Sequence, residues 1–343
     1  MIRGLRHFAV TCALSLTAVA VAAAPAQPAA GSKPKALSGV QQDKALLAFQ
    51  RDLVSVLAPR ADALPLLAAA LLARPLVNPP KTSSFHSLIG RAAMAGGEDA
   101  AVAWVRLADC DDKADACPNA AALDQLQSQA PDNAAVWLLK LGVDTRGMKS
   151  DAARADLAKA AAATTYDDYT GTSLKALADS VGVLPPPAGL LTPGNPSSAL
   201  AVQLALVFGL GSTQPQPGLP VVAQLCKDAG SDASIKSDCL KLGKLLEWGS
   251  SPLARSLGLH LREVLADDPA QQEDARRSRI NLVWQVQNFS QLSIRAQTDP
   301  ALAQRLLALA RNGGTEMSLM LAALRDSHIG TDAPAGWQPS KPQ

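Results

Sequence analysis

Cysteines are the residues of this sequence whose spacing most directly suggests chemistry. Four of the five stand in two close pairs, Cys110 with Cys117 and Cys226 with Cys239. Neither pair has the C-x-x-C spacing of a redox or metal motif, and an even number of cysteines in an exported chain favours disulfides. Four cysteines allow three pairings, and closeness along the chain favours bonding within each pair. We therefore predict two local disulfides.

The other chemically capable residues form no recognisable catalytic motif. His86, His260 and His328 lie on separate predicted helices, and none has a metal-ligand spacing such as H-E-x-x-H. The sequence has no G-x-S-x-G turn, and residues 209–211 lack the third glycine and the preceding strand of a dinucleotide-binding loop. We expect no catalytic residue, no cofactor-binding residue and no metal ligand, so the protein is predicted not to be an enzyme.

Acidic residues recur between other residues over positions 109–115, and their spacing resembles that of a calcium-binding loop. Lys113 stands at a ligand position, Ala114 replaces the required glycine, and Ala120 occupies the place of the bidentate glutamate. A solvated turn is the preferred interpretation, and weak calcium binding is the open alternative.

The N-terminus has the layout of a secretory signal peptide. Two arginines precede an apolar run over residues 8–21, and small residues follow, so we predict cleavage after Ala22 or Ala23 and a signal peptide over residues 1–23. Cys12 lies early in the apolar run and is interpreted as part of the discarded signal, not as a lipid anchor. The alternative is an uncleaved membrane helix, for which the run is short. The predicted location is periplasmic or secreted.

Composition narrows the class of partner that the chain is expected to bind. The net charge of +2 falls to near zero once Arg3 and Arg6 leave with the signal, which gives no electrostatic reason to expect nucleic acid. Hydrophobic residues make up 48% of the chain but aromatic residues only 3%. The core must then be built from Ala, Leu and Val, which favours closely packed helices.

Hydrophobic periodicity predicts helices along almost the whole mature chain and no strand. Each cysteine pair straddles the turn of a predicted helical hairpin, and an apolar helix over residues 199–210 is expected to dock two halves together. Tryptophans 104, 137 and 284 lie in apolar helical stripes and are expected in the core. The predicted segments are a flexible leader (24–42), an N-terminal hairpin array (43–187), a Pro/Gly-rich linker (188–220), a C-terminal hairpin array (221–329) and a loose tail (330–343).

Residues 131–164 carry a family resemblance. Trp137 is followed by the small residue Ala153, the bulky Leu157 and the small Ala160. These residue types have the separations found in a helical repeat of two helices. The segment therefore resembles a tetratricopeptide repeat, with a departure at Gly142, which comes one residue later than the glycine that this family prefers. Sel1-like secreted proteins with cysteine-bridged hairpins are also similar. The resemblance implies an all-α, right-handed α-hairpin array, an irregular tetratricopeptide/Sel1-like α-solenoid.

In proteins of that type the usual ligand is a peptide or another protein. We therefore expect an exported, non-catalytic interaction or scaffold protein with a protein or peptide partner in the cell envelope, no nucleic acid, and no stable membrane insertion after signal cleavage. An envelope-stress or assembly role is one form of this hypothesis. The alternative is an envelope enzyme with a site assembled from scattered Asp, Glu and His. A groove lined by apolar and Asn/Arg side chains would favour the binder, and a deep pocket joining His260 or His328 to carboxylates would favour the enzyme.

Overall fold

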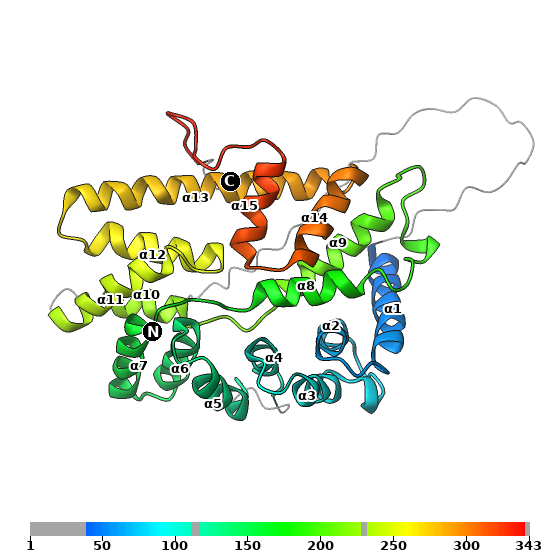
Figure 1. Cartoon of the computed structure of the whole chain (residues 1–343), viewed down its shortest axis with the longest axis horizontal. Coiled ribbons are helices and arrows are strands. Elements are labelled where there is room, and N and C mark those ends of the chain that lie inside the picture. Colours follow the sequence, from blue (N-terminus) through cyan, green and yellow to red (C-terminus); the bar gives the residue numbers. More distant parts are fainter. Residues whose placement is uncertain (1–38, 111–116, 228–231, 340–343) are drawn as a thin grey trace, which may run out of the picture. The chain divides into compact units, whose positions relative to one another are not determined.

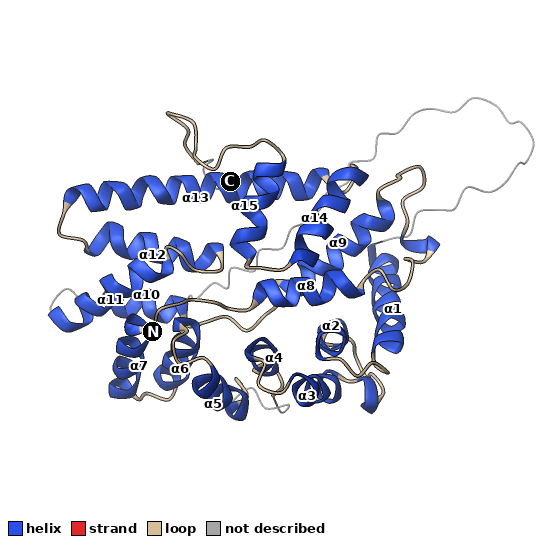
Figure 2. Cartoon of the chain, in the orientation of Figure 1, coloured by secondary structure: helices blue, strands red, loops and turns tan. Residues whose placement is uncertain are grey.

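The protein is all-helical, as its periodicity predicts. The computed structural model describes residues 39–110, 117–227 and 232–339, and within these residues there are fifteen α-helices and no strand (Figures 1 and 2). The predicted signal peptide, and the leader as far as residue 38, lie outside the described residues. No helix in the described ranges is long and apolar enough to cross a membrane.

The helices are, in chain order, α1 (Gly39–Leu57), α2 (Ala63–Ala73), α3 (Phe85–Gly96), α4 (Ala100–Arg106), α5 (Ala120–Gln129), α6 (Ala134–Arg146), α7 (Ser150–Ala162), α8 (Thr170–Ser180), α9 (Ser198–Gly211), α10 (Leu219–Lys227), α11 (Ala233–Leu246), α12 (Pro252–Leu265), α13 (Pro269–Arg295), α14 (Pro300–Asn312) and α15 (Glu316–Asp326).

Local capping residues explain where several helices begin. The carboxylate of Asp268 accepts a hydrogen bond from Ala270 N at 2.9 Å, and that of Asp299 accepts one from Leu302 N at 3.0 Å. Proline follows each aspartate at the first helical position, where its missing N–H costs nothing. Both helix starts are therefore explained by two neighbouring residues.

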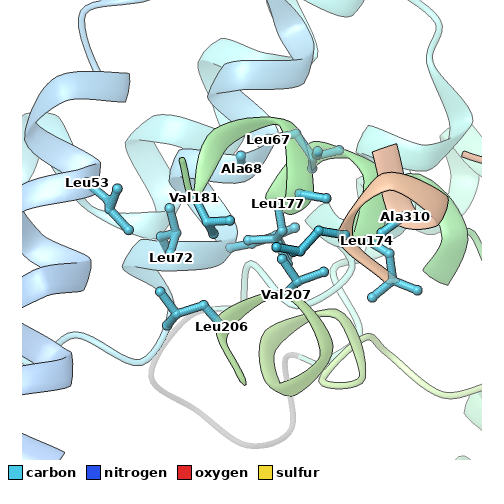
Figure 3. Close-up of a cluster of buried hydrophobic side chains, with 14 of the residues drawn as sticks. Leu53, Leu67, Ala68, Leu72, Leu174, Leu177, Val181, Leu206, Val207 and Ala310 are labelled. Atoms are coloured by element: carbon cyan, nitrogen blue, oxygen red, sulfur yellow. The ribbon is translucent and has the colours of Figure 1, made fainter. Parts of the chain in front are cut away.

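The first hydrophobic cluster is centred on α2. Every residue from Leu66 to Ala73 is buried, as expected of a helix that is apolar on all sides. Around it pack side chains of α1, α3, α8, α9, α14 and α15. Figure 3 shows Leu72 of α2 among Leu177 and Val181 of α8 and Val207 of α9.

The second cluster joins α4–α7 to α10–α12. The two predicted arrays therefore do not have separate cores, because α8 packs against both α2 and α14, while α10 and α11 pack against α6 and α7. The predicted linker carries α9, which contacts α2 and α8 of the first array and α14 of the second. The described residues form one compact unit.

The predicted burial of three tryptophans in the core is confirmed only in part. Trp104 is completely buried, whereas Trp137 and Trp284 are partly exposed. Trp284 instead receives the predicted loose tail: its indole N–H donates to Gly330 O at 2.9 Å, and its ring meets Trp337 edge to face at 5.3 Å. The structure differs from the sequence prediction here, because polar side chains of α13 supply hydrogen bonds to tail backbone that no composition signal reveals.

Glycine permits the closest helix contact. A Cβ placed on Gly171, in the first turn of α8, would lie 1.8 Å from Gly314 O in the link between α14 and α15. Any residue with a side chain would require the backbone to move at this position. This contact fixes α8 against the C-terminal helices.

We predict that Gly171→Ala lowers the free energy of unfolding by about 2–4 kcal/mol, because the added methyl overlaps a backbone carbonyl. Gly209→Ala in α9 is the matched control: nothing lies within 4 Å of its new Cβ, so the variant gains about 0.5–1 kcal/mol of helix propensity. Urea denaturation measures both. Equal free energies of unfolding for the two variants would contradict the close contact between Gly171 and Gly314.

Candidate functional site

Both predicted disulfides are present. Cys110 is bonded to Cys117, with Cα atoms 5.3 Å apart, and Cys226 to Cys239, with Cα atoms 5.8 Å apart. The first joins the end of the α4 region to the start of the α5 region, and the second ties α10 to α11 inside the second core, where both cysteines are fully buried. Residues 111–116 are outside the described residues, and the calcium-loop hypothesis falls on them.

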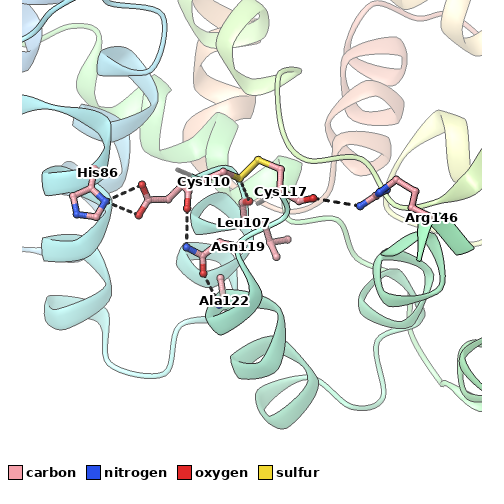
Figure 4. Close-up of a disulfide and its surroundings, with 8 residues drawn as sticks. His86, Leu107, Cys110, Cys117, Asn119, Ala122 and Arg146 are labelled. Carbon is pink, nitrogen blue, oxygen red and sulfur yellow. Dashed lines mark hydrogen bonds and ion pairs between the residues drawn. A yellow bond between two sulfur atoms is a disulfide. The ribbon is translucent and has the colours of Figure 1, made fainter. Parts of the chain in front are cut away.

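The first disulfide lies beside a His–Asp pair that the sequence analysis missed. His86 Nδ1 is 3.0 Å from both carboxylate oxygens of Asp109, and Asn119 Nδ2 donates to Asp109 O at 2.7 Å (Figure 4). The His86 side chain is 86% exposed. The pair ties α3 to the residues before the disulfide, and its imidazole stays in contact with solvent.

The other two histidines of the described ranges belong to separate parts of the fold. His260 is exposed on α12, and His328 is exposed just after α15 with φ of 57°. Neither lines the two cavities described below. Within the described ranges, no three His, Cys, Asp or Glu side chains are arranged to hold a metal ion.

An open cavity of about 790 Å³ lies between α7, α10 and α11, and we name it the α7/α11 groove. This volume is within the usual range for ligand sites. Apolar side chains of α10 and α11 form much of its wall, with hydroxyl and charged groups around them. The lining residues are Thr145, Ser150, Ala153, Arg154, Val221, Gln224, Leu225, Asp232, Ala233, Ser234 and Ile235.

Two glycines bring α10 close enough to α6 to form this groove. Gly218 N donates to Leu138 O at 3.2 Å, and a Cβ on Gly218 would lie 2.7 Å from that oxygen and 3.3 Å from the Cα of Gly142. Gly142 therefore receives the start of α10. The Cys226–Cys239 disulfide then holds α10 to α11.

Opposite charges face each other at the rim of the groove. Arg154 Nη1 lies 3.4 Å from Asp232 Oδ2, with the side chains 58% and 36% exposed. Asp232 Oδ1 also accepts from the backbone N–H groups of Ser234 and Ile235 at the start of α11. An exposed ion pair contributes little stability, so a ligand carboxylate could replace Asp232 as the partner of Arg154 at small cost.

A cluster of buried charges lies between α6 and α7. The carboxylates of Asp144 and Asp156 are each 4% exposed. Lys140 Nζ forms a hydrogen bond with Asp144 and lies 3.8 Å from Asp156 Oδ2. Lys149 and Lys159 approach from the surface, at 3.8 Å from Asp144 and 3.9 Å from Asp156. The i,i+4 spacing of Lys140 and Asp144 is the signal that the sequence analysis passed over.

The two carboxylates differ in proton affinity. Burial raises the pKa of Asp156 to about 6, with the neighbouring Asp144 adding to the rise. The hydrogen bond from Lys140 lowers the pKa of Asp144. Neither residue lines the groove or the second cavity, and we assign this cluster a role in stability.

We predict that Asp156→Asn removes a pH dependence of stability. The folded state holds the Asp156 proton up to a pKa of about 6 against a usual 3.8, so it binds more protons than the unfolded chain between these values, and the free energy of unfolding falls as pH rises through that window. Asn is uncharged at every pH, so its burial does not lower the free energy of unfolding as ionisation of Asp156 does. The variant should exceed wild type by on the order of 1–2 kcal/mol at neutral pH and by little in acid.

Denaturant titrations across the pH window measure this difference. Asp151→Asn, an exposed position on the same helix, should keep the wild-type slope. If Asp156→Asn shows the wild-type slope as well, the assignment of the proton to this cluster fails.

Comparison of this chain with known proteins finds no relative. No protein-family model, no curated protein and no solved structure matches the chain. The resemblance of residues 131–164 to tetratricopeptide and Sel1-like repeats therefore stays a prediction. The function has to be argued from the side chains themselves.

Proposed function

We propose that this protein is an exported, non-catalytic interaction protein that binds a peptide segment of a partner in the α7/α11 groove. The observation that carries the proposal is the character of the groove: apolar side chains of Val221, Leu225 and Ile235 lie beside the exchangeable Arg154–Asp232 pair. Apolar anchors with a charged rim are the usual features of peptide-binding grooves.

The charges favour one type of peptide. Helix-terminal N–H groups already compensate the carboxylate of Asp232, whereas Arg154, among the residues that the structure describes, is paired through one long contact of 3.4 Å. A peptide with apolar side chains for the wall and a carboxylate for Arg154 matches both features. We infer a segment of an acidic, amphipathic kind.

The arrangement of hairpins supports the repeat-like part of the proposal. Consecutive helices pack in the pairs α6 with α7, α11 with α12 and α12 with α13, and α7 packs against α11, which follows it in the chain after three other helices. The close approach of α7 to α6 is made through Ala153 and Ala160, both buried. An irregular tetratricopeptide/Sel1-like hairpin array, right-handed as in those families, is the arrangement we propose for this part of the chain.

Two disulfides support an oxidising compartment, in agreement with the predicted signal peptide. The proposed location is the periplasm or the extracellular space. The lining of the groove supports a non-catalytic role, because Asp232 is its one carboxylate among the described residues and no histidine or cysteine belongs to it. No specific observation favours the enzyme alternative.

Peptides selected from a displayed random library on the mature, oxidised protein test the proposal. We predict enrichment of acidic, amphipathic sequences, and at least about tenfold weaker binding to Ala233→Trp, because the indole fills the groove from an exposed position. Arg154→Ala should weaken the acidic peptides and leave purely apolar ones unchanged.

Ala155→Trp is the matched control, because Ala155 is also exposed and stands next to Arg154 outside the groove lining. Circular dichroism confirms that both tryptophan variants fold. Equal binding to the two variants would exclude the groove as the site, and a selection that enriches no peptide would refute the proposed function.

A further inference from the structure

The link between α7 and α8 takes part in a second cavity and in a polar junction. The cavity, of about 310 Å³, is lined by residues 129–133 and by Thr165, Asp167 and Tyr169. The junction lies where the link meets the turn between α11 and α12 and the start of α15. We name it the Ser250 junction, and its members are Tyr166, Asp168, Ser250, Glu316 and Met317.

Ser250 holds three segments of the chain together. Its backbone N–H donates to Tyr166 O at 3.2 Å, and its hydroxyl donates to Asp168 Oδ1 and accepts from Asp168 N, both at 3.1 Å. Its carbonyl oxygen accepts from Met317 N at 2.9 Å. Ser250 and Asp168 are each 3% exposed, so these hydrogen bonds are shielded from water.

The bond from Met317 docks the start of α15. The first N–H groups of an α-helix have no partner within the helix, and Met317 belongs to the first turn of α15. Its N–H is therefore protected from solvent only while α15 lies against Ser250. The Met317 side chain is fully buried with Leu259 of α12 and Leu282 of α13. Loosening of this turn would thus appear directly in the exchange of one amide.

Glu316, the first residue of α15, is a half-buried carboxyl group at this junction. Among the described residues it forms no ion pair. Burial raises the pKa of Glu316 from a usual 4.5 to about 7, and the charge of Asp168 adds to the rise. Ionisation of Glu316 therefore introduces a negative charge that the carboxylate held by Ser250 opposes.

The other groups of the link do not compensate this charge. Asp167 is acidic as well, and burial raises its pKa. Burial also raises the pKa of the Tyr166 phenol well above its usual value, so that the phenol stays neutral. α12 and α13 meet the start of α15 through the apolar side chains of Leu259 and Leu282.

Cations of the neighbouring elements are engaged with backbone carbonyl groups. Arg255 Nε donates to Gly249 O at 2.9 Å, Arg311 Nε to Ala178 O at 3.0 Å, and Lys175 Nζ to Arg311 O at 2.7 Å. Arg325 and Asp326 stand at the opposite end of α15. The charge that acts on Glu316 is therefore that of Asp168.

We propose that the Ser250 junction is a pH-sensitive clasp: protonated Glu316 keeps the start of α15 docked on Ser250, and ionisation of Glu316 near Asp168 loosens it. Between pH values of about 4.5 and 7, the docked state holds a proton that the opened state releases. The free energy of docking is therefore greatest in acid, falls as pH rises through this window and is constant above it. The junction shares no residue with the lining of the α7/α11 groove, so the clasp is independent of the proposed peptide.

Hydrogen exchange of single amides, measured by NMR on the mature, oxidised protein, tests the clasp. After correction for intrinsic exchange, the Met317 amide should be at least about tenfold more protected at pH 5 than at pH 7.5, because the opening equilibrium changes by up to about tenfold for each pH unit within the window. Met317 should also be less protected than the Leu71 amide in the buried helix α2, since the start of α15 opens without unfolding of the core.

One substitution and a matched control assign the proton to Glu316. Glu316→Gln keeps the size and the hydrogen-bonding groups of a protonated glutamate and does not ionise. We expect this variant to keep the acid level of Met317 protection at both pH values. Asp326→Asn, at an exposed position on the same helix, should retain the wild-type pH dependence.

Carbon-13 NMR of the Glu316 side-chain carboxyl measures the proton in the wild-type protein. The titration midpoint should lie at about 7. Asp168→Asn should move it to lower pH, because the neighbouring charge is removed while an oxygen remains to accept from Ser250.

Four results would overturn the proposal. They are a Glu316 midpoint at the usual 4.5, Met317 protection that does not change with pH, the wild-type pH dependence in Glu316→Gln, and equal protection of Met317 and Leu71. The last result would mean that α15 opens only together with the whole fold.

Discussion

The hydrogen bonds of one asparagine side chain are the constraint on which the rest of the structure depends. The link between α7 and α8 belongs to no sheet and meets the start of α6 in a single bridge between Thr165 and Asn133. Where the link is buried, at Tyr166 and Asp168, its backbone polar groups must be paired. Asn133, itself the N-cap of α6, supplies the pairing: its amide bonds both the N–H and the C=O of Asp167, while Ala134 N donates to Thr165 O at 2.8 Å. The link is thereby fixed to the start of α6, and with it the direction in which α8 leaves.

The same link connects the two hydrophobic clusters. Asp168 is 3% exposed, and its backbone N–H and carboxylate both bond the hydroxyl of Ser250, in the turn between α11 and α12. Ser250 O in turn accepts from Met317 N at the start of α15. Burial raises the pKa of Glu316, beside Met317, to about 7, and Asp168 contributes to the rise. The groove side and the α2 side of the molecule are therefore held together by polar contacts as well as by the α8 core.

Sequence reasoning succeeded where the signal is local. The helical secondary structure and the pairing of Cys110 with Cys117 and of Cys226 with Cys239 follow from residues near each other in the chain. It missed what depends on distant contacts. Gly142 lies against Gly218, and the tail lies on α13 because Trp284 and its neighbours bond it. Neither cavity has a local signature, since each is bounded by segments far apart in sequence.

Hydrogen exchange of backbone amides in the link tests the central claim most directly. The amides of Asp167 and Asp168 donate to side chains, Asn133 Oδ1 and Ser250 Oγ, and not to a helix. If these side chains hold the link as described, both amides exchange as slowly as the core amides of α6, and Asn133→Ala makes them exchange at least about a hundredfold faster. Exchange of both amides in the wild type at the rate of an exposed loop would contradict the account.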